Sequence, residues 1–179
     1  MDEQLGVSTL NICKEAKKRG IPILKIGEES MFQLGYGKYS KIIQATMDSE
    51  TSAIAVSIAQ DKMQTKEILS MHSLPVADGS KVVNFTDTIS CAIDIGYPVV
   101  LKPQFGNQGK GVIANIKNEK QLLDAYELLA KDYKDIIIEK CIIGRDYRVL
   151  CVYGDIVAVS ERIPPFIIGD GISSIEKLI

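Results

Sequence analysis

The sequence is poor in the residues that most metal and acid–base sites use. It has one histidine, His72, which precedes Ser73-Leu74-Pro75 at an expected helix end, so neither a histidine-based triad nor a zinc site is supported. The four cysteines lie far apart without a CxxC pair, and we expect reduced thiols that pack in the core as small hydrophobic side chains. They are Cys13, Cys91, Cys141 and Cys151.

Long runs of charge and of apolar residues are absent as well. The 21 basic and 23 acidic residues give a net charge of -2 without a long run of either sign, so nucleic acid is not an expected partner. No apolar stretch approaches the roughly 20 residues needed to cross a bilayer. The acidic start Met1-Asp2-Glu3 does not resemble a signal peptide. We therefore expect a cytoplasmic protein with no membrane partner.

What is present fits a globular protein of mixed secondary structure. The 179 residues, 46% hydrophobic and 25% charged, suffice for a buried core and allow one domain or two small lobes. Helical and strand-like patterns predict helices at 8–19, 51–59 and 62–71, an extended segment from Ile21, and a hairpin joined by a glycine turn at 32–46. Ser52 and Asp61 are the expected helix caps.

The second half alternates helices and strands in an α+β manner. We expect strands at 82–83, 99–102, 112–116 and 136–140, and helices at 87–95 and 119–131. A hairpin follows at 147–160, with Gly154-Asp155 as its turn. Pro and Gly punctuate the pattern near Leu74–Gly79, where we place a lobe boundary. A last helix begins at Ser173-Ser174 and stops at Ile179, which suggests a piece of a longer protein.

The strongest local signal is a glycine-rich loop between two strands. Pro98–Val112 is a buried strand ending at Lys102, then a loop with three glycines and Lys110, then another strand. Glycines let backbone N–H groups approach oxygen atoms, and the lysines supply positive charge, so phosphate could bind. The spacing is neither a Walker A motif nor a Rossmann fingerprint. Alone, such a loop could equally be a flexible hairpin with solvated lysines.

A second signal is the apolar strand Ile136–Lys140 with the segment that follows it. Its backbone groups could pair with the edge of an adenine, and Asp146 could accept hydrogen bonds from ribose hydroxyls. An exposed sheet edge with a Glu139–Lys140 pair is the alternative. Lys62, taken alone, would be an ordinary surface lysine.

Together these segments resemble the ATP-grasp ligases. The order is Asp61-Lys62, then Pro98–Pro103 with its glycine loop, then Glu139-Lys140 and Gly144–Arg148. The resemblance implies an α/β (α+β) ATP-grasp fold, in which two α+β lobes clamp ATP. It implies phosphate contacts from Lys62, Lys102, Gly106, Asn107, Gln108, Gly109, Lys110 and Gly111. It implies adenine contacts from Glu139, Lys140, Cys141 and Ile142, and a ribose contact from Asp146.

The same resemblance divides the chain into three parts. Residues 1–74 would be an N-terminal linker or A-subdomain region, 75–144 the B-subdomain that clamps the nucleotide with the glycine-rich loop, and 145–179 the incomplete start of the C-terminal subdomain. Arg148 and Arg162 are the candidate catalytic residues, because arginines near these positions hold phosphate or acceptor carboxylate in the resembling ligases. Surface salt bridges are the alternative for both.

Further segments resemble the cyanophycin synthetases within that family. They are Gln33–Gly37, Thr51–Val56, Asp61-Lys62 with Thr65-Lys66, and Ile168–Gly171. Gln108 departs from the pattern, since that family usually has histidine there, which leaves the role of this side chain open.

The resemblance implies an ATP-dependent carboxylate–amine ligase in the full-length form, with this piece alone inactive. A substrate carboxylate would attack the γ-phosphate, and an amine would then attack the acylphosphate, with release of ADP and phosphate. The implied partners are ATP, Mg²⁺, an amino acid (aspartate), and a peptide or polymer primer, in a homo-oligomer with a Mur-ligase-like region downstream. No metal ligand is expected in these residues. The alternatives are a module of a glutathione-type or D-alanine-type ligase, and a non-catalytic nucleotide-binding module.

Overall fold

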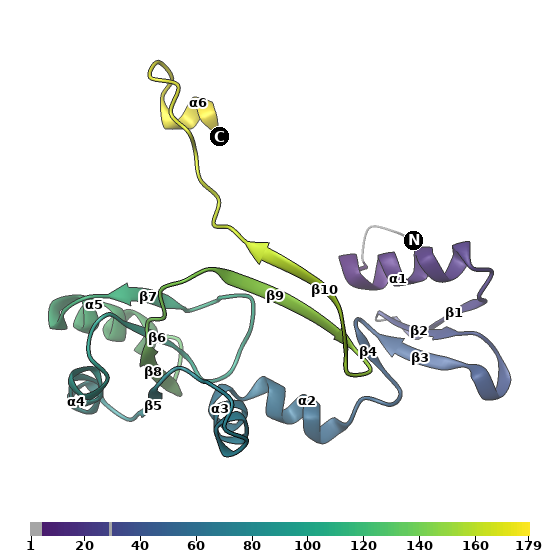
Figure 1. Cartoon of the computed structure of the whole chain (residues 1–179), viewed down its shortest axis with the longest axis horizontal. Helices are drawn as coiled ribbons and strands as arrows, with labels where there is room; N and C mark the ends of the chain where they lie inside the picture. Colours follow the sequence, from purple (N-terminus) through teal and green to yellow (C-terminus); the bar gives the residue numbers. More distant parts are fainter. Residues whose placement is uncertain (1–4, 29) are drawn as a thin grey trace.

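Three antiparallel sheets organise the molecule, which is described by a computed structural model over residues 5–28 and 30–179. The first sheet has the strand order β1-β2-β3-β4, the second β5-β8-β6-β7, and the third is the hairpin β10-β9. Figure 1 shows the first two sheets at opposite ends of the molecule, with helices α2 and α3 between them and the hairpin crossing from one to the other. The expected α+β class is confirmed.

The N-terminal unit is a helix laid against a four-stranded sheet. Its elements are α1 (Val7–Lys18), β1 (Ile23–Ile26), β2 (Met31–Leu34), the 3-10 turn η1 (Gly37–Tyr39), β3 (Lys41–Gln44) and β4 (Met47–Asp48). The predicted helix and hairpin are present, with η1 lengthening the predicted glycine turn. A small core forms where Ala16 of the helix, Phe32 and Ile43 are buried.

Two consecutive helices share one residue at their junction. The helices are α2 (Ala53–Gln60) and α3 (Lys62–Met71). Ser52 Oγ accepts a hydrogen bond from the Ala55 N–H at 3.4 Å, and Asp61 Oδ1 accepts from Met63 and Gln64 at 2.9 and 3.2 Å. Both predicted caps are confirmed. Such caps satisfy N–H groups that have no partner inside the helix.

The central part of the chain alternates strands and helices around one core. Its elements are β5 (Gly79–Val82), α4 (Phe85–Ile95), β6 (Val99–Pro103), β7 (Ile113–Ile116), α5 (Glu119–Ala130) and β8 (Ile136–Lys140). Each matches a predicted element within a few residues. We call residues 79–140 the loop lobe. Its core joins residues of both helices and all four strands: Val82, Ala92, Val99, Leu101, Ile116, Leu122, Ala125, Leu129, Ile136 and Ile138.

Alternation along β6 and β8 separates the core from the opposite face of this sheet. Successive strand side chains point to opposite faces. Leu101 and Ile138 are paired in register and belong to the core, so Lys102 and Glu139, one residue further along, point to the face opposite α4 and α5. The sheet thereby presents a lysine and a carboxylate on one face.

The third sheet is an exposed hairpin, β9 (Asp146–Val152) and β10 (Asp155–Arg162). The predicted turn Gly154-Asp155 is wrong by one residue, because Asp155 already pairs with Val152 and the turn is Tyr153-Gly154. Both turn residues have positive φ, 51° and 90°, which suits a two-residue hairpin turn with glycine second. The Tyr153 hydroxyl donates to Asp48 Oδ2 at 3.1 Å, so the tip of the hairpin reaches the N-terminal unit.

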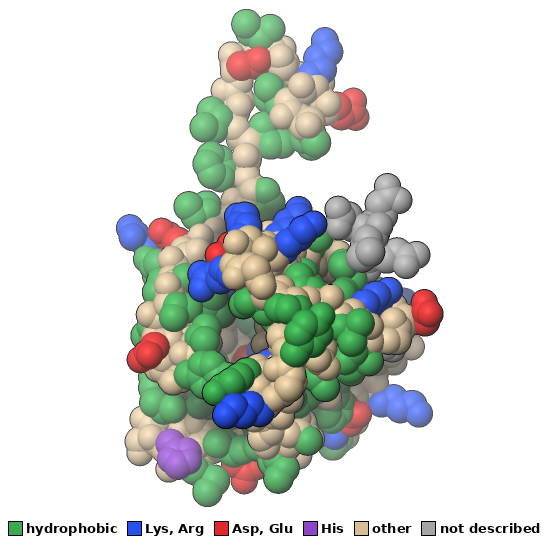
Figure 2. All heavy atoms as spheres, turned by 90° about the vertical axis from the view of Figure 1, so that its right-hand side faces the viewer, with side chains coloured by type: hydrophobic (Ala, Val, Ile, Leu, Met, Phe, Trp, Pro, Cys, Tyr) green, Lys and Arg blue, Asp and Glu red, His purple; other side chains and the backbone are tan. Residues whose placement is uncertain are grey.

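The remaining residues extend away from the body. Residues 163–174 lack regular structure and lead to α6 (Ile175–Leu178), with Ser174 at its N-cap as predicted. Figure 2 shows this segment standing clear of the body, with hydrophobic side chains along it. No helix in the described part of the chain is long and apolar enough to cross a membrane.

The four thiols are free, as predicted, and Cys91 packs against the core of the loop lobe. Cys13, Cys91 and Cys141 are partly buried and Cys151 is exposed. The prediction is wrong for Cys151 because β9 belongs to a hairpin that is exposed on both faces, so its apolar neighbours do not form a core around it.

Candidate functional site

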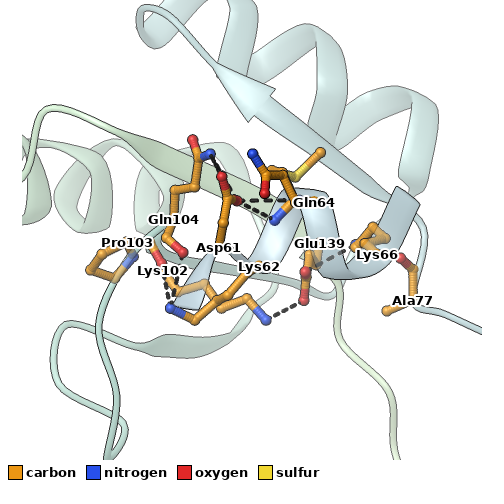
Figure 3. A network of polar contacts seen from close by, with 10 residues as sticks. Asp61, Lys62, Gln64, Lys66, Ala77, Lys102, Pro103, Gln104 and Glu139 are labelled. Carbon is orange, nitrogen blue, oxygen red and sulfur yellow. Dashed lines mark hydrogen bonds and ion pairs between the residues drawn. The ribbon is translucent and has the colours of Figure 1, made fainter. Parts of the chain in front are cut away.

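A polar cluster forms where the start of α3 meets the ends of β6 and β8 (Figure 3). The first turns of α3 contribute Lys62 and Lys66, β6 contributes Lys102, and β8 contributes Glu139. Three segments far apart in sequence therefore bring three lysines and one carboxylate together, and Lys66 and Lys102 contact that carboxylate directly. We call these four side chains the lysine cluster.

Glu139 is the centre of this cluster. Its side chain is only 11% exposed and receives Lys102 Nζ on Oε2 at 2.5 Å and Lys66 Nζ on Oε1 at 2.9 Å. Burial alone would raise the pKa of Glu139, but the hydrogen bonds and charges of Lys102 and Lys66 outweigh it and lower the pKa. The carboxylate is therefore ionised at neutral pH and fixes the position of both ammonium groups.

Lys62 is bound to the base of the glycine loop. Its Nζ donates to three carbonyl oxygens, those of Pro103 at 2.9 Å, Gln104 at 3.3 Å and Gly106 at 3.1 Å. Burial, followed by repulsion from Lys102, lowers the pKa of Lys62, against the attraction of Glu139 and Asp61. The ordinary surface lysine considered from the sequence is not what the structure shows.

A buried pair supports the start of α3. Gln104 Nε2 donates to both carboxylate oxygens of Asp61, at 2.9 and 3.0 Å, and both residues are buried. Burial raises the pKa of Asp61, but the hydrogen bonds from Gln104 and from the Gln64 and Met63 N–H groups lower it overall. Asp61 thus caps α3 and ties that helix to the strand that leads into the glycine loop.

The loop itself, Gly106–Gly111, presents its backbone to solvent. Residues 105–110 are exposed, and φ is positive at Gly106, Gln108, Gly109 and Gly111. Gly111 is also tightly enclosed, since a Cβ there would lie 2.8 Å from the Tyr133 ring and 2.9 Å from Pro103. The loop is therefore anchored at both ends, by Lys62 at one end and Tyr133 at the other, with Asn107–Lys110 free to meet a ligand.

The predicted adenine-binding segment offers one N–H group. The N–H of Lys140 donates to Asp78 O at 2.7 Å and that of Cys141 to Pro98 O at 3.0 Å. The N–H of Ile142 has no acceptor among the described residues, and its side chain is exposed. Lys140 Nζ points the other way and bonds carbonyls at the end of α4, with Gly96 O at 2.7 Å. Any contact of Lys140 with a base would therefore use its backbone.

The structure does not bring the hairpin residues to the lysine cluster. Asp146 and Arg162 are cross-strand neighbours on β9 and β10 and form an ion pair with each other. Arg148 lies opposite Ser160 on the same exposed hairpin. The salt bridge considered from the sequence is thus present for Arg162. No contact between these three side chains and the lysine cluster occurs in residues 5–28 and 30–179.

Lys66 and Gln104 are site residues that the sequence reasoning missed. Lys66 follows Lys62 by four residues on α3, which places both on the same helix face, so the signal was available. Gln104 follows the strand that carries Lys102, but the sequence gives no sign that its amide would meet Asp61.

Comparison with known proteins agrees with this fold. The family described as "Carbamoyl-phosphate synthase L chain, ATP binding domain" matches residues 61–150, half of the chain, which covers α3, the loop lobe and most of β9. The fold is that of the ATP-grasp proteins, and the chain belongs to this ATP-binding domain family.

Particular relatives extend the likeness beyond the matched half. Cyanophycin synthetase of Trichormus variabilis is 44% identical over 99% of this chain, and a glutathione biosynthesis bifunctional protein of Clostridium perfringens is 29% identical over 99%. The chain spans only 20% of the former and 23% of the latter. The sequence resemblance to the cyanophycin synthetases is thereby confirmed.

Solved structures show the same fold at lower identity. A bifunctional glutathione synthetase from Pasteurella multocida aligns with a TM-score of 0.57 at 23% identity, over 96% of this chain and 24% of that one. An ATP-grasp RimK domain protein from Sphaerobacter thermophilus aligns with a TM-score of 0.51 at 20% identity, over 57% and 40%. These likenesses support the fold and leave the substrates to be argued from the site.

Proposed function

We propose that this chain is the nucleotide-binding part of an ATP-dependent carboxylate–amine ligase of the cyanophycin synthetase kind. The observation that carries the proposal is the lysine cluster at the base of an exposed glycine loop. Lys62 and Lys102 bring two ammonium groups to loop backbone that can approach anionic oxygens closely. The 44% identity to a cyanophycin synthetase over 99% of the chain supports the particular kind of ligase.

In this proposal the two ends of the site bind different parts of ATP. Lys62, Lys102 and the amides of Gly106–Gly111 hold the phosphates, with Asn107, Gln108, Gly109 and Lys110 on the exposed part of the loop. The Ile142 N–H and the carbonyl groups of the Glu139–Ile142 segment meet the adenine edge, and Asp146 meets the ribose. Because Asp146 is paired with Arg162, binding of ribose exchanges or shares that partner.

The protein takes little direct part in making and breaking bonds in the proposed reaction. An acceptor carboxylate oxygen attacks the γ-phosphorus, the bond from that phosphorus to the β,γ-bridging oxygen breaks, and ADP leaves. An amine then attacks the acylphosphate carbon, phosphate leaves and an amide forms. Alignment and charge stabilisation dominate phosphoryl transfer, which is the task that Lys62 and Lys102 suit. Arg148 and Arg162 are proposed to hold phosphate or the acceptor carboxylate.

The described residues do not provide a set of ligands for magnesium. Among the described residues, no group of three His, Cys, Asp or Glu side chains is arranged to hold a metal ion. No step above therefore depends on a metal held by this chain. The acceptor amino acid, aspartate, the Asp/Arg polymer primer, the homo-oligomer and the cytoplasmic location belong to the proposal through the relatives alone.

Nucleotide binding is tested first. Calorimetric titration of the 179-residue chain with ATP in magnesium buffer should show binding, and Lys102→Met should weaken it about tenfold or more, because a charge-assisted contact to phosphate is lost. Lys120→Met on α5, which removes the same charge from an exposed position, is the matched control and should bind like the wild type. Equal binding by Lys102→Met and wild type would contradict the phosphate site.

The ligase activity is tested in the whole protein. ADP release with aspartate and an Asp/Arg primer, and none with glutathione precursors or D-alanine, would support the cyanophycin synthetase reading over the glutathione-type and D-alanine-type alternatives. ATP binding without ADP release for any acceptor would support a non-catalytic nucleotide-binding module instead.

A further inference from the structure

Lys66 is a partly buried cation that the nucleotide site described above does not use. It lies one turn after Lys62 on α3, and its side chain is 13% exposed. Its Nζ donates to Ala77 O at 2.6 Å and pairs with Glu139 Oε1 at 2.9 Å. One ammonium group thus joins the helix, the connection before β5 and the end of β8, as Figure 3 shows.

The contact between Lys66 and Glu139 affects the net charge of the lysine cluster. Glu139 gives one carboxylate oxygen to Lys66 and the other to Lys102. Without Lys66, the full charge of this buried carboxylate would fall on Lys102, and the pair would be neutral. With Lys66 present, two ammonium groups face one carboxylate, and the three groups together carry one positive charge.

The other nearby carboxylate does not cancel that charge by an ion pair. Asp61 takes its hydrogen bonds from the Gln104 amide and from the N–H groups of Met63 and Gln64. Among the described residues, the ammonium group of Lys62 donates only to neutral carbonyl oxygens. The face below the glycine loop is therefore positive, which suits an anion that carries several charges.

We infer that Lys66 is a positioning residue for the phosphate site: it holds one oxygen of Glu139 and offsets its charge, so that the ammonium group of Lys102 stays available to a nucleotide phosphate. The inference rests on the proposed nucleotide binding and adds a residue to it. Lys66 acts without touching the nucleotide, because its ammonium group is already bound by Glu139 and Ala77.

The first test compares ATP with adenosine. Lys66→Met should weaken ATP binding to the 179-residue chain about tenfold, as expected for one charge removed near a polyphosphate in a partly buried site, and should leave adenosine binding unchanged. Lys66→Arg keeps the charge and should stay within about threefold of the wild type. Lys120→Met again controls for the loss of one charge elsewhere on the chain.

The second test is the pH dependence of the same affinities. Glu139 in Lys66→Met remains buried but has lost one cation, so its pKa should rise relative to the wild type. As the pH is lowered, Glu139 takes up a proton first in the variant, and the negative charge beside Lys102 disappears. The ratio of the ATP dissociation constants, variant over wild type, should therefore fall with pH. The protonation of ATP itself cancels in this ratio.

The outcomes separate the two proposals. If the wild type binds ATP and Lys66→Met binds it equally well, or loses ATP and adenosine alike with no trend in pH, the inference is wrong and the nucleotide site stands. If the wild type binds no ATP, the proposed function fails in this chain. A carboxylate ¹³C titration of Glu139, assigned with Glu139→Gln, still decides whether Lys66 lowers its pKa, and an unchanged pKa in Lys66→Met overturns the inference.

Discussion

Glu139 shows how one buried carboxylate can organise several cations. A charge removed from water is costly unless partners surround it, and Glu139 has two, Lys66 and Lys102. The two lysines in turn gain fixed positions that flexible side chains on a surface would not have. The sequence analysis predicted both Lys102 and Glu139 as site residues, but it expected Glu139 to contact adenine. Strand alternation alone does not show which partner a carboxylate meets.

The lowered pKa of Glu139 predicts a pH-dependent contribution to stability. The ordinary pKa of this carboxyl group, taken for the unfolded state, is 4.5, and the pKa in the folded state is lower. Such a group stabilises the fold at pH values above 4.5. This stabilisation disappears as the pH falls through the folded-state pKa. Glu139→Gln should therefore lower the free energy of unfolding by about 2 kcal/mol at pH 7 and by less as the pH falls below 4.5. Urea denaturation at pH 7 and at a series of lower pH values measures this, and an equal loss at every pH would contradict the ionised assignment.

At the scale of elements, the helices and strands were largely predictable. The caps Ser52 and Asp61 were read correctly because capping depends on local chemistry. The hairpin turn was misplaced by one residue because a two-residue turn at 153–154 requires positive φ at Tyr153, a residue that rarely adopts it. The contacts of Lys62 with loop carbonyls could not be predicted, since they join residues about 42 positions apart.

The middle and the last residue of the glycine loop predict unequal effects of the same substitution. Gly109 and Gly111 both have positive φ, 74° and 68°, so alanine costs about 1 kcal/mol of backbone strain at either position. A Cβ at Gly109 meets open space, whereas at Gly111 it meets the Tyr133 ring and Pro103. Gly111→Ala should therefore lower the melting temperature clearly more than Gly109→Ala. Equal shifts in a thermal unfolding experiment would show that Tyr133 does not fix the loop.

At the scale of the molecule, the loop lobe is the most completely packed part. Its core joins two helices to one face of a four-stranded sheet, whereas β9, β10 and residues 163–179 are exposed apart from Leu178, which is partly buried. The division near Leu74–Gly79 stays a prediction. The hydrogen bond between Tyr153 at the hairpin tip and Asp48 could not be predicted from the sequence, because the two residues are 105 positions apart.

This contrast predicts the order of proteolysis. Phe166 is 72% exposed in a segment without regular structure, whereas Phe85 and Tyr126 pack against the core of the loop lobe and against each other. Chymotrypsin should cut after Phe166 well before it cuts after Phe85 or Tyr126, because cleavage requires local unfolding. Mass spectrometry of a time course measures this order. Early cuts after Phe85 or Tyr126 would show that the lobe is not a stable unit.

The alternation along β8 gives that strand the equivalent of a reading frame. Ile136, Ile138 and Lys140 lie on the side of α4 and α5, while Ile137 and Glu139 are buried on the opposite side, where Glu139 meets Lys66 of α3. Deleting a single residue upstream within the strand would shift this frame by one and exchange the two sides. Lys140 would then stand where Glu139 pairs with two lysines, so attraction would become repulsion among three like charges. Strand length is in this sense part of the site's chemistry, as much as the identity of any residue in it.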